Sequence, residues 1–294
     1  MRNALALQQI NKTYDHFRLH DIDLSVPEGQ IMGLVGVNGA GKTTLMRILM
    51  GLIRPDSGNV EVLGLPMPDA QVAAKRDIGF ASEDMRLYQS QSLRWHMDFV
   101  SSIYPSWDEH YAEELMKRFD LRAEQVLRGF SHGQRVKAML LLNLARRPKL
   151  LLLDEPTTGL DPVARSEVLE ALSDVLRDET RTVMFSSHNT HDVEQLSDTI
   201  TFMHQGRILA CKDKESFLDD WRRILCQGTL SEQVKGLPGV AMARQNGSIV
   251  EIKVRHYRDD LPEALRKEGL LVQRVEPMNL EDIFVTTVRA GASA

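Results

Sequence analysis

A glycine-rich segment, 36-GVNGAGKT-43, has the residue types and the spacing that bind phosphate groups. It matches the pattern G-x-x-x-x-G-K-[ST], with a short apolar run before it and a helix-like run after it. The glycines allow the backbone to wrap with its N–H groups inward, and the dipole of the following helix also attracts phosphate oxygens. Lys42 is expected to reach the β- and γ-phosphates of a nucleotide, and the Thr43 hydroxyl to bind Mg²⁺. The alternative is a glycine-rich turn with a merely solvated lysine.

Two carboxylates follow the apolar run 150-LLLLD-154. Four leucines predict a buried central strand, and its carboxyl end would bring Asp154 to the edge where open α/β sheets bind ligands. Asp154 suits a contact to Mg²⁺ through water. Glu155, next in the chain, can accept a proton from an attacking water molecule. The alternative is a pair of surface acids at the end of a strand.

His188 directly follows another apolar run, 182-TVMFSS-187. By analogy with Asp154, its imidazole would lie at the same sheet edge, where it could bind the γ-phosphate and orient water. A polar side chain that only caps the strand explains this histidine as well.

A polar segment, 129-GFSHGQ-134, precedes a helix-length apolar run. Ser131 and Gln134 have the S-x-x-Q spacing of a capping box, which predicts the start of a helix. Such a start has spare N–H groups and a positive dipole, so it can bind an anion. An ordinary capped helix explains Ser131 and Gln134 but not Gly133, which suits close backbone approach to a ligand.

Alternating strands and helices would bring these residues together. Residues 31–36, 150–154 and 182–187 are short apolar strands separated by helical patterns, which predicts an α/β fold with a mostly parallel sheet. Residues 4–35 have the alternation and turns of an antiparallel β region. Residues 92–128 have a helical pattern rich in aromatic side chains. Arg146, Arg147 and Pro148 are expected to end the helix that begins at Ser131.

The pattern changes after residues 205–220, which predicts a second domain. Asn246-Gly247 between two alternating runs is a strong hairpin signal, and a helix, a strand and a last helix are expected after it. We therefore expect one domain over 1–215, with a helical subdomain over about 88–145, and a small α+β domain over 216–294.

The overall composition is that of an ordinary globular chain of 294 residues. The formal net charge of −5 argues against nucleic acid as a main partner. Two cysteines form no disulfide framework and indicate a cytosolic setting. No apolar run approaches the roughly 18 residues of a membrane helix, so any membrane association would need a partner or a surface.

Taken together, these motifs resemble the ATP-binding subunit of an ABC transporter, over roughly residues 2–215. The family elements occur in order: the aromatic Tyr14, the phosphate loop, 130-FSHGQ-134, Asp154-Glu155, 159-GLD-161 and His188. The segments 104-YPSWD-108 and 281-EDIF-284 look like a branch that pairs with separate membrane subunits and exports drugs, antimicrobial peptides or lipids.

The resemblance implies a P-loop NTPase core with an N-terminal antiparallel β subdomain and an inserted helical subdomain. It implies ATP and Mg²⁺ as cofactors, Glu155 as general base, His188 as a second catalytic residue, and Thr43, Asp154 and Glu83 as metal contacts. Tyr14 would stack on adenine, although a hairpin core aromatic explains it too. The implied ATP-binding residues are Tyr14, Gly36, Val37, Asn38, Gly39, Ala40, Gly41, Lys42, Thr43, Thr44, Glu83, Ser131, Gly133, Gln134 and Asp161.

Two positions depart from the family pattern. Glu83 stands where the family usually has glutamine; it could still accept from metal-bound water, or it is simply a surface acid. His132 stands where the family prefers glycine, and it either contacts the nucleotide, points away from it or is merely tolerated.

The resemblance also implies a mechanism. Two copies, or one copy and a homologous ATPase, would bind ATP head to tail, with Ser131 of one chain facing the γ-phosphate on the other and Asp161 at the seam. Hydrolysis would drive export through an integral membrane subunit, with this chain peripheral on the cytoplasmic face of the membrane. The alternatives are the motor of an ATP-driven importer and a non-transport ABC ATPase acting on ribosomes or DNA.

Overall fold

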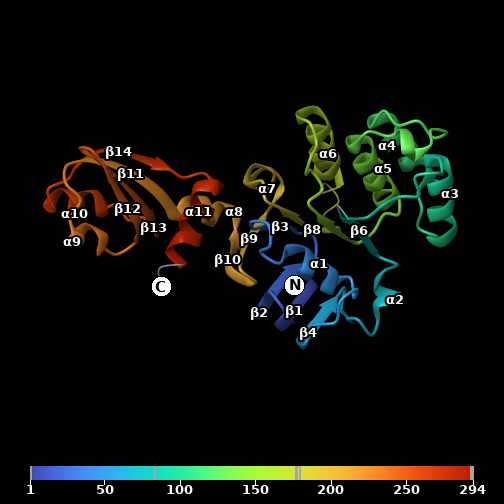
Figure 1. Cartoon of the computed structure of the whole chain (residues 1–294), viewed down its shortest axis with the longest axis horizontal. Coiled ribbons are helices and arrows are strands. Elements are labelled where there is room, and N and C mark those ends of the chain that lie inside the picture. Colours follow the sequence, from blue (N-terminus) through green and yellow to red (C-terminus); the bar gives the residue numbers. More distant parts are fainter. Residues whose placement is uncertain (1, 83, 176–177, 179, 292–294) are drawn as a thin grey trace. The chain divides into compact units, whose positions relative to one another are not determined.

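The computed structural model describes residues 2–82, 84–175, 178 and 180–291. It divides into two compact units, one ending at Ile208 and the other beginning at Leu209. Figure 1 shows the elements of each unit. The change of unit lies within strand β10 (Arg207–Asp213), a few residues before the position 215/216 expected from the sequence.

The first unit contains an antiparallel sheet of four strands in the order β2-β1-β4-β5. The strands are β1 (Asn3–Tyr14), β2 (Phe17–Pro27), β4 (Ser57–Val62) and β5 (Leu65–Pro66). Alternate side chains of β2, namely Ile22, Leu24 and Val26, are buried, because one face of the sheet packs on the core and the other faces solvent. This is the antiparallel β subdomain expected at the N-terminus.

The central sheet of this unit has the strand order β10-β9-β3-β8-β7-β6. Its other members are β3 (Ile31–Val35), β6 (Ile78–Ser82), β7 (Leu150–Asp154), β8 (Thr182–Ser187) and β9 (Thr199–His204). The pairings of β3 with β8 and β9, of β7 with β8 and of β6 with β7 are all parallel. Helices α1 (Lys42–Leu49), α2 (Gln71–Ala74), α6 (Pro162–Val175) and α7 (Thr190–Leu196) belong to the same unit. The expected α/β core is therefore confirmed.

A helical group is inserted between the neighbouring strands β6 and β7. It consists of α3 (Leu93–Ile103), α4 (Glu109–Arg118), a 3₁₀ turn (Leu127–Gly129) and α5 (His132–Leu144), and Figure 1 shows the three helices side by side. The sequence pattern predicted helix throughout 92–128, which is wrong for residues 104–108, between α3 and α4, and for residues 119–126. Asp120 there has a positive φ of 50°, a conformation that a helix interior does not allow.

As expected from the sequence, α5 ends just before Arg146, and the side chain of Arg146 makes contacts far from this helix end. Its guanidinium is buried, donates to the carbonyls of Lys75 and Ile78 at 3.0 and 2.9 Å, and stacks 3.5 Å from the ring of Tyr104. It therefore ties the helical group to the strand β6 that precedes it.

The second unit has the antiparallel sheet order β12-β13-β11-β14. Its elements are α8 (Lys214–Asp220), β11 (Trp221–Gln227), α9 (Glu232–Lys235), β12 (Val240–Asn246), β13 (Ile249–Arg255), α10 (Leu261–Lys267), β14 (Leu271–Pro277) and α11 (Leu280–Gly291). The predicted hairpin turn is present: β12 ends at Asn246, Gly247 has a φ of 60°, and Asn246 pairs with Ile249. In the described part of the chain, no helix is both long and apolar enough to cross a bilayer.

Candidate nucleotide site

The glycine-rich loop joins β3 to α1 at the carboxyl edge of the central sheet. Gly41 precedes the helix with φ 111° and ψ 5°, which an L side chain rarely adopts. A Cβ on Gly36 would lie 2.6 Å from the carbonyl oxygen of Met203, so packing demands glycine there. A Cβ on Gly39 would meet no atom within 4 Å, so this part of the loop faces open space.

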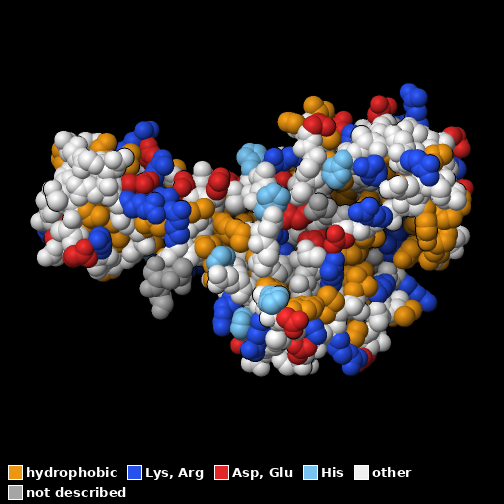
Figure 2. Space-filling model, in the orientation of Figure 1, with side chains coloured by type: hydrophobic (Ala, Val, Ile, Leu, Met, Phe, Trp, Pro, Cys, Tyr) orange, Lys and Arg blue, Asp and Glu red, His pale blue; other side chains and the backbone are white. Residues whose placement is uncertain are grey.

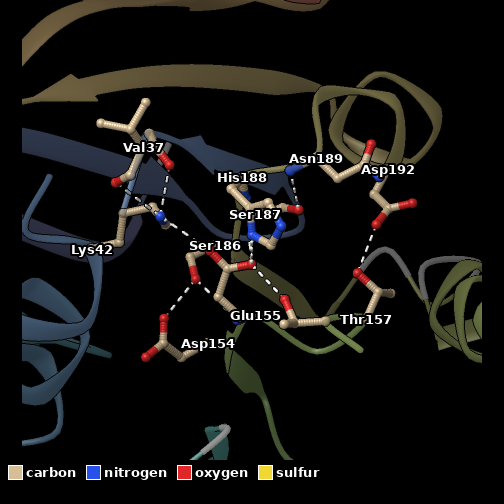
Figure 3. A network of polar contacts seen from close by, with 12 residues as sticks. Val37, Lys42, Asp154, Glu155, Thr157, Ser186, Ser187, His188, Asn189 and Asp192 are labelled. Carbon is tan, nitrogen blue, oxygen red and sulfur yellow. Dashed lines mark hydrogen bonds and ion pairs between the residues drawn. The ribbon is translucent and has the colours of Figure 1, made fainter. Parts of the chain in front are cut away.

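Lys42 points back into its own loop. Its ammonium group is buried, donates to the carbonyl oxygen of Gly36 at 2.7 Å, and lies 3.1 Å from Oε1 of Glu155 (Figure 3). The contact with Glu155 is an ion pair, because Oε1 has no well-aligned hydrogen bond.

Ser186 connects the two carboxylates at the end of β7. Its hydroxyl donates to Oδ1 of Asp154 at 2.6 Å and accepts the backbone N–H of Glu155 at 3.0 Å. The parallel register sets this contact, since Asp154 pairs with Ser186 across the two strands. The role of Ser186 was not predicted from the sequence. The available signal was that Asp154 and Ser186 lie near the ends of two apolar strands, where parallel pairing would bring them together.

Glu155 is the centre of the polar network in Figure 3. Its Oε2 lies 2.8 Å from Nδ1 of His188 and accepts the Thr158 hydroxyl at 2.9 Å, while Oε1 faces Lys42. Burial alone would raise the pKa of Glu155, but the charge of Lys42, with smaller contributions from Thr158 and His188, holds it below its ordinary value. Thr158 is a second contact that the sequence analysis missed.

The oxygen atoms near the loop fit a magnesium ion. Asp154 has one carboxylate oxygen on Ser186 and a second that can face a ligand, and Thr43 follows Lys42 in the first turn of α1. Hydroxyl and carboxylate oxygens are the donors that Mg²⁺ prefers. Glu83, the third residue expected at the metal, lies outside the described residues.

The predicted capping box is present at the start of α5. Ser131 Oγ accepts the N–H of Gln134 at 3.2 Å, and Gln134 Oε1 accepts the N–H of Ser131 at 2.9 Å. A Cβ on Gly133 would come no closer than 3.4 Å to its neighbours, an ordinary contact with Ala164. Packing within this chain therefore does not demand glycine at this position.

His132 turns toward the segment that follows Glu155. Its Nε2 lies 2.9 Å from the carbonyl oxygen of Thr158, so this nitrogen carries the proton and donates it. The side chain of His132 is therefore hydrogen-bonded within its own chain, to Thr158.

Asp161 and Tyr14 lie outside the Glu155 network. Asp161 Oδ1 accepts the N–H groups of Val163 and Ala164 at 2.9 and 3.0 Å, and these bonds, that of Ala164 first, lower the pKa of Asp161. Tyr14 is 42% exposed at a hairpin tip, opposite Phe17, whose ring packs against Gly41 of the loop.

A cavity of about 330 Å³ lies between the end of β7 and the start of α5. It is lined by Ala81, Ser82, Met85, Arg86, Leu87, Gln89, Leu127, His132, Arg135, Val136, Met139, Leu140, Asp154, Glu155, Pro156 and Thr158. Lys42, Asp154, Glu155 and His188 thus meet at one sheet edge, while Ser131 and Gln134 bond to each other at the start of α5.

The chain is similar to ATP-binding proteins of ABC transporters. The family model described as "ABC transporter" matches residues 19–158. A Nod factor export ATP-binding protein I of Cupriavidus metallidurans is 29% identical over 296 residues, covering 97% of each chain. The lantibiotic transport ATP-binding protein SrtF of Streptococcus pyogenes is 32% identical over 212 residues, covering 71% of this chain and 90% of that protein. A solved ATP-binding subunit of an ABC transporter aligns with a TM-score of 0.68 and 26% identity, over 74% of this chain and 92% of its own.

Proposed function

This chain belongs to the ABC transporter family of ATP-binding subunits, and from that premise we propose that it is the motor of an exporter, working as a head-to-tail dimer on a separate membrane subunit. ATP binding and hydrolysis coupled to transport are the activity of the family. The export direction draws on the Nod factor export relative, whose similarity extends over almost the whole chain.

The observation that carries the proposal is the Lys42–Glu155–His188 network beside the phosphate loop. An incoming γ-phosphate gives Lys42 a new anionic partner, and Lys42 then releases Oε1 of Glu155. With Lys42 on the phosphate, burial raises the pKa of the Glu155 carboxylate with less opposition, and the carboxylate becomes a better acceptor for the proton of the water that attacks phosphorus. His188 holds the other oxygen of Glu155 through Nδ1 and has its second ring nitrogen for the phosphate.

Mg²⁺ is the proposed cofactor, with Thr43 and Asp154 as its protein contacts and Glu83 as a further candidate. When bound, the ion supplies charge neutralisation on the β- and γ-phosphate oxygens. Ser186 keeps Asp154 oriented for that role by donating to one of its two oxygens.

A second copy would complete each site. Ser131 Oγ already accepts the Gln134 N–H, which leaves its hydroxyl proton to donate to a phosphate oxygen. Gly133 leaves space for close approach, although its own chain would tolerate a side chain there. These groups are the proposed site for the γ-phosphate bound to the other copy, with Asp161 at the seam and Tyr14 on the adenine. The second unit is the proposed accessory domain.

An exposed aromatic cluster on α3 and in the segment just before it is the proposed contact for the membrane subunit. Trp95 stacks on Phe99 at 5.3 Å and meets Tyr88 edge-on at 5.6 Å, and Ile103 continues the surface. Hydrophobic side chains gather over α3 in Figure 2. Clustered exposed aromatic groups are typical of interfaces rather than of solvated surfaces. Through this contact the subunit would lie on the cytoplasmic face of the membrane.

Copurification tests the proposal. The chain is tagged in its native cells and extracted in mild detergent, and an integral membrane subunit should copurify and stimulate ATP hydrolysis. Phe99→Glu should lose that subunit while ATP affinity, measured separately, shows that the chain is folded. Recovery of ribosomes or DNA in place of a membrane subunit would overturn the proposal.

A further inference from the structure

The unusual histidine at the start of α5 is connected to the proposed general base. We propose that His132 is a positioning residue, which holds the segment 156–160 through the Thr158 carbonyl and so couples the start of α5 to Glu155. The inference rests on the proposed function, because it takes Glu155 as the base and α5 as the site for the phosphate on the second copy.

The first contact is the hydrogen bond from His132 Nε2 to the Thr158 carbonyl oxygen at 2.9 Å. Gly159 makes room for it: a Cβ there would lie 3.1 Å from Nε2 and 3.4 Å from Cδ2 of the imidazole. Gly159 also has a φ of 72°, which turns the chain so that the carbonyl of Thr158 faces the ring. The imidazole is therefore seated on this turn rather than free in solvent.

The second contact joins Thr158 to Glu155, the proposed base. The Thr158 hydroxyl donates to Oε2 of Glu155 at 2.9 Å, so one residue binds His132 with its backbone and Glu155 with its side chain. On the other side, Thr157 donates to the buried carboxylate of Asp192 at 2.6 Å. The segment thus has one anchor in the core, through Asp192, and one on α5, through His132.

The position of His132 within α5 is the third observation. It is the first residue of the helix, between Ser131 and Gly133, which are proposed to meet the phosphate bound to the other copy. A small shift of this helix start therefore moves the Thr158 carbonyl. It also moves the Thr158 hydroxyl, which donates a hydrogen bond to Glu155. Occupancy of one site would in this way align the base of the other.

The geometry argues against a direct contact between His132 and the phosphate. The proton on Nε2 is already donated to Thr158, and the side chain lines the same cavity as Glu155. The neighbouring Ser131 hydroxyl, by contrast, retains a proton to donate.

Hydrogen–deuterium exchange tests the anchor without any need for hydrolysis. In the nucleotide-free protein, His132→Ala should speed exchange in a peptide covering 156–161, where the N–H groups of Thr158 and Leu160 close turns. His132→Gln, which keeps a side-chain N–H donor, should restore slow exchange. His110→Ala removes an exposed histidine from the first turn of α4 and should change nothing there. Unchanged exchange in His132→Ala would overturn the proposal.

Kinetics test the coupling to the base. At saturating ATP, His132→Ala should lower kcat about fivefold, the effect of one lost hydrogen bond, and leave ATP affinity unchanged. Thr158→Val removes the hydroxyl that donates to Glu155. The double variant should be no slower than the slower single variant, because His132 is proposed to act on Glu155 through this Thr158 hydroxyl. Fully additive losses would contradict the coupling.

The dimer separates this inference from the proposed function. In a Glu155→Gln background, ATP should still hold His132→Ala as a dimer, because Ser131 and Gly133 remain. Loss of the dimer would show that His132 binds the phosphate itself and would overturn the positioning role. An inactive wild-type protein that never dimerises would instead contradict the proposed function, and exchange at 156–161 would still decide the anchor.

Discussion

Lys42 and Glu155 are each other's ionic partner: 3.1 Å separates the ammonium nitrogen from Oε1, and the two side chains are only 6% and 11% exposed. The cation proposed to hold phosphate and the carboxylate proposed to take a proton are thus paired with one another in this structure. In the proposed mechanism, ATP exchanges this internal pair for a phosphate contact, which would link substrate binding to release of the base.

Replacing Lys42 should affect both partners. Lys42→Ala is expected to weaken ATP binding by at least tenfold, since a buried cation that faces phosphate is lost. It should also raise the pKa of Glu155, because burial would then act with less opposing charge. Equilibrium ATP titration and carboxyl NMR would measure the two effects. Lys149→Ala, which removes an exposed lysine paired with Asp77, is the matched control and should change neither.

Glu155→Gln should separate binding from turnover. The amide cannot accept a proton, so ATP hydrolysis should fall by about 10²–10⁴-fold. ATP affinity should be retained or increased, because the carboxylate no longer competes with phosphate for Lys42. Gel filtration with and without ATP should then show a nucleotide-dependent dimer. Hydrolysis at the wild-type rate would remove Glu155 from the role of base.

The same ion pair should make stability depend on pH in a defined range. The folded-state pKa of Glu155 lies below its ordinary value of about 4.3–4.5, so the pair stabilises the folded chain above that pH. This contribution should disappear as the pH falls through the lowered folded-state pKa. The difference in Tm between the wild type and Glu155→Gln should therefore be largest near neutral pH and shrink in acid. A difference that grew as the pH fell would have the wrong sign.

Ser131→Ala should have two effects. Loss of the N-cap should cost about 1 kcal/mol of unfolding free energy, and loss of the hydroxyl should weaken the ATP-dependent dimer of Glu155→Gln. Ser92→Ala is a matched control, because Ser92 caps α3 by accepting the Trp95 N–H at 3.2 Å. It should cost a similar amount of stability and leave the dimer intact. Equal dimer loss in both variants would mean that only folding had been affected.

Much of the site could be predicted because its parts are local patterns. The glycine loop, the capping box of Ser131 and Gln134, and the hairpin at Asn246-Gly247 each depend on residues close in the chain. Ser186 and Thr158 were missed because their roles depend on strand register and on the course of a turn. The partner of His132 could not be foreseen for the same reason.

Arg146 illustrates another limit. The sequence places this arginine correctly at the end of a helix, but it does not reveal that the guanidinium bonds to carbonyls of Lys75 and Ile78, about 70 residues earlier in the chain. Only the three-dimensional arrangement brings those carbonyls beside it. The helical prediction failed over 104–108 and 119–126 because large side chains at helix-like spacing do not reveal where the backbone turns, as it does at Asp120.

The strand order also determines when the site can form during protein synthesis. The strand that leads into the phosphate loop is made early, yet Ile31 pairs with Val183, and the Gly29 N–H bonds to the Thr182 hydroxyl 153 residues away. The ribosome must therefore release the entire helical insertion and β7 before β3 acquires this neighbour. Until then the apolar strands Ile31–Val35 and Leu150–Asp154 lack the strand that lies between them. A truncated product ending before β8 would leave both apolar strands without this neighbour and should aggregate rather than bind nucleotide.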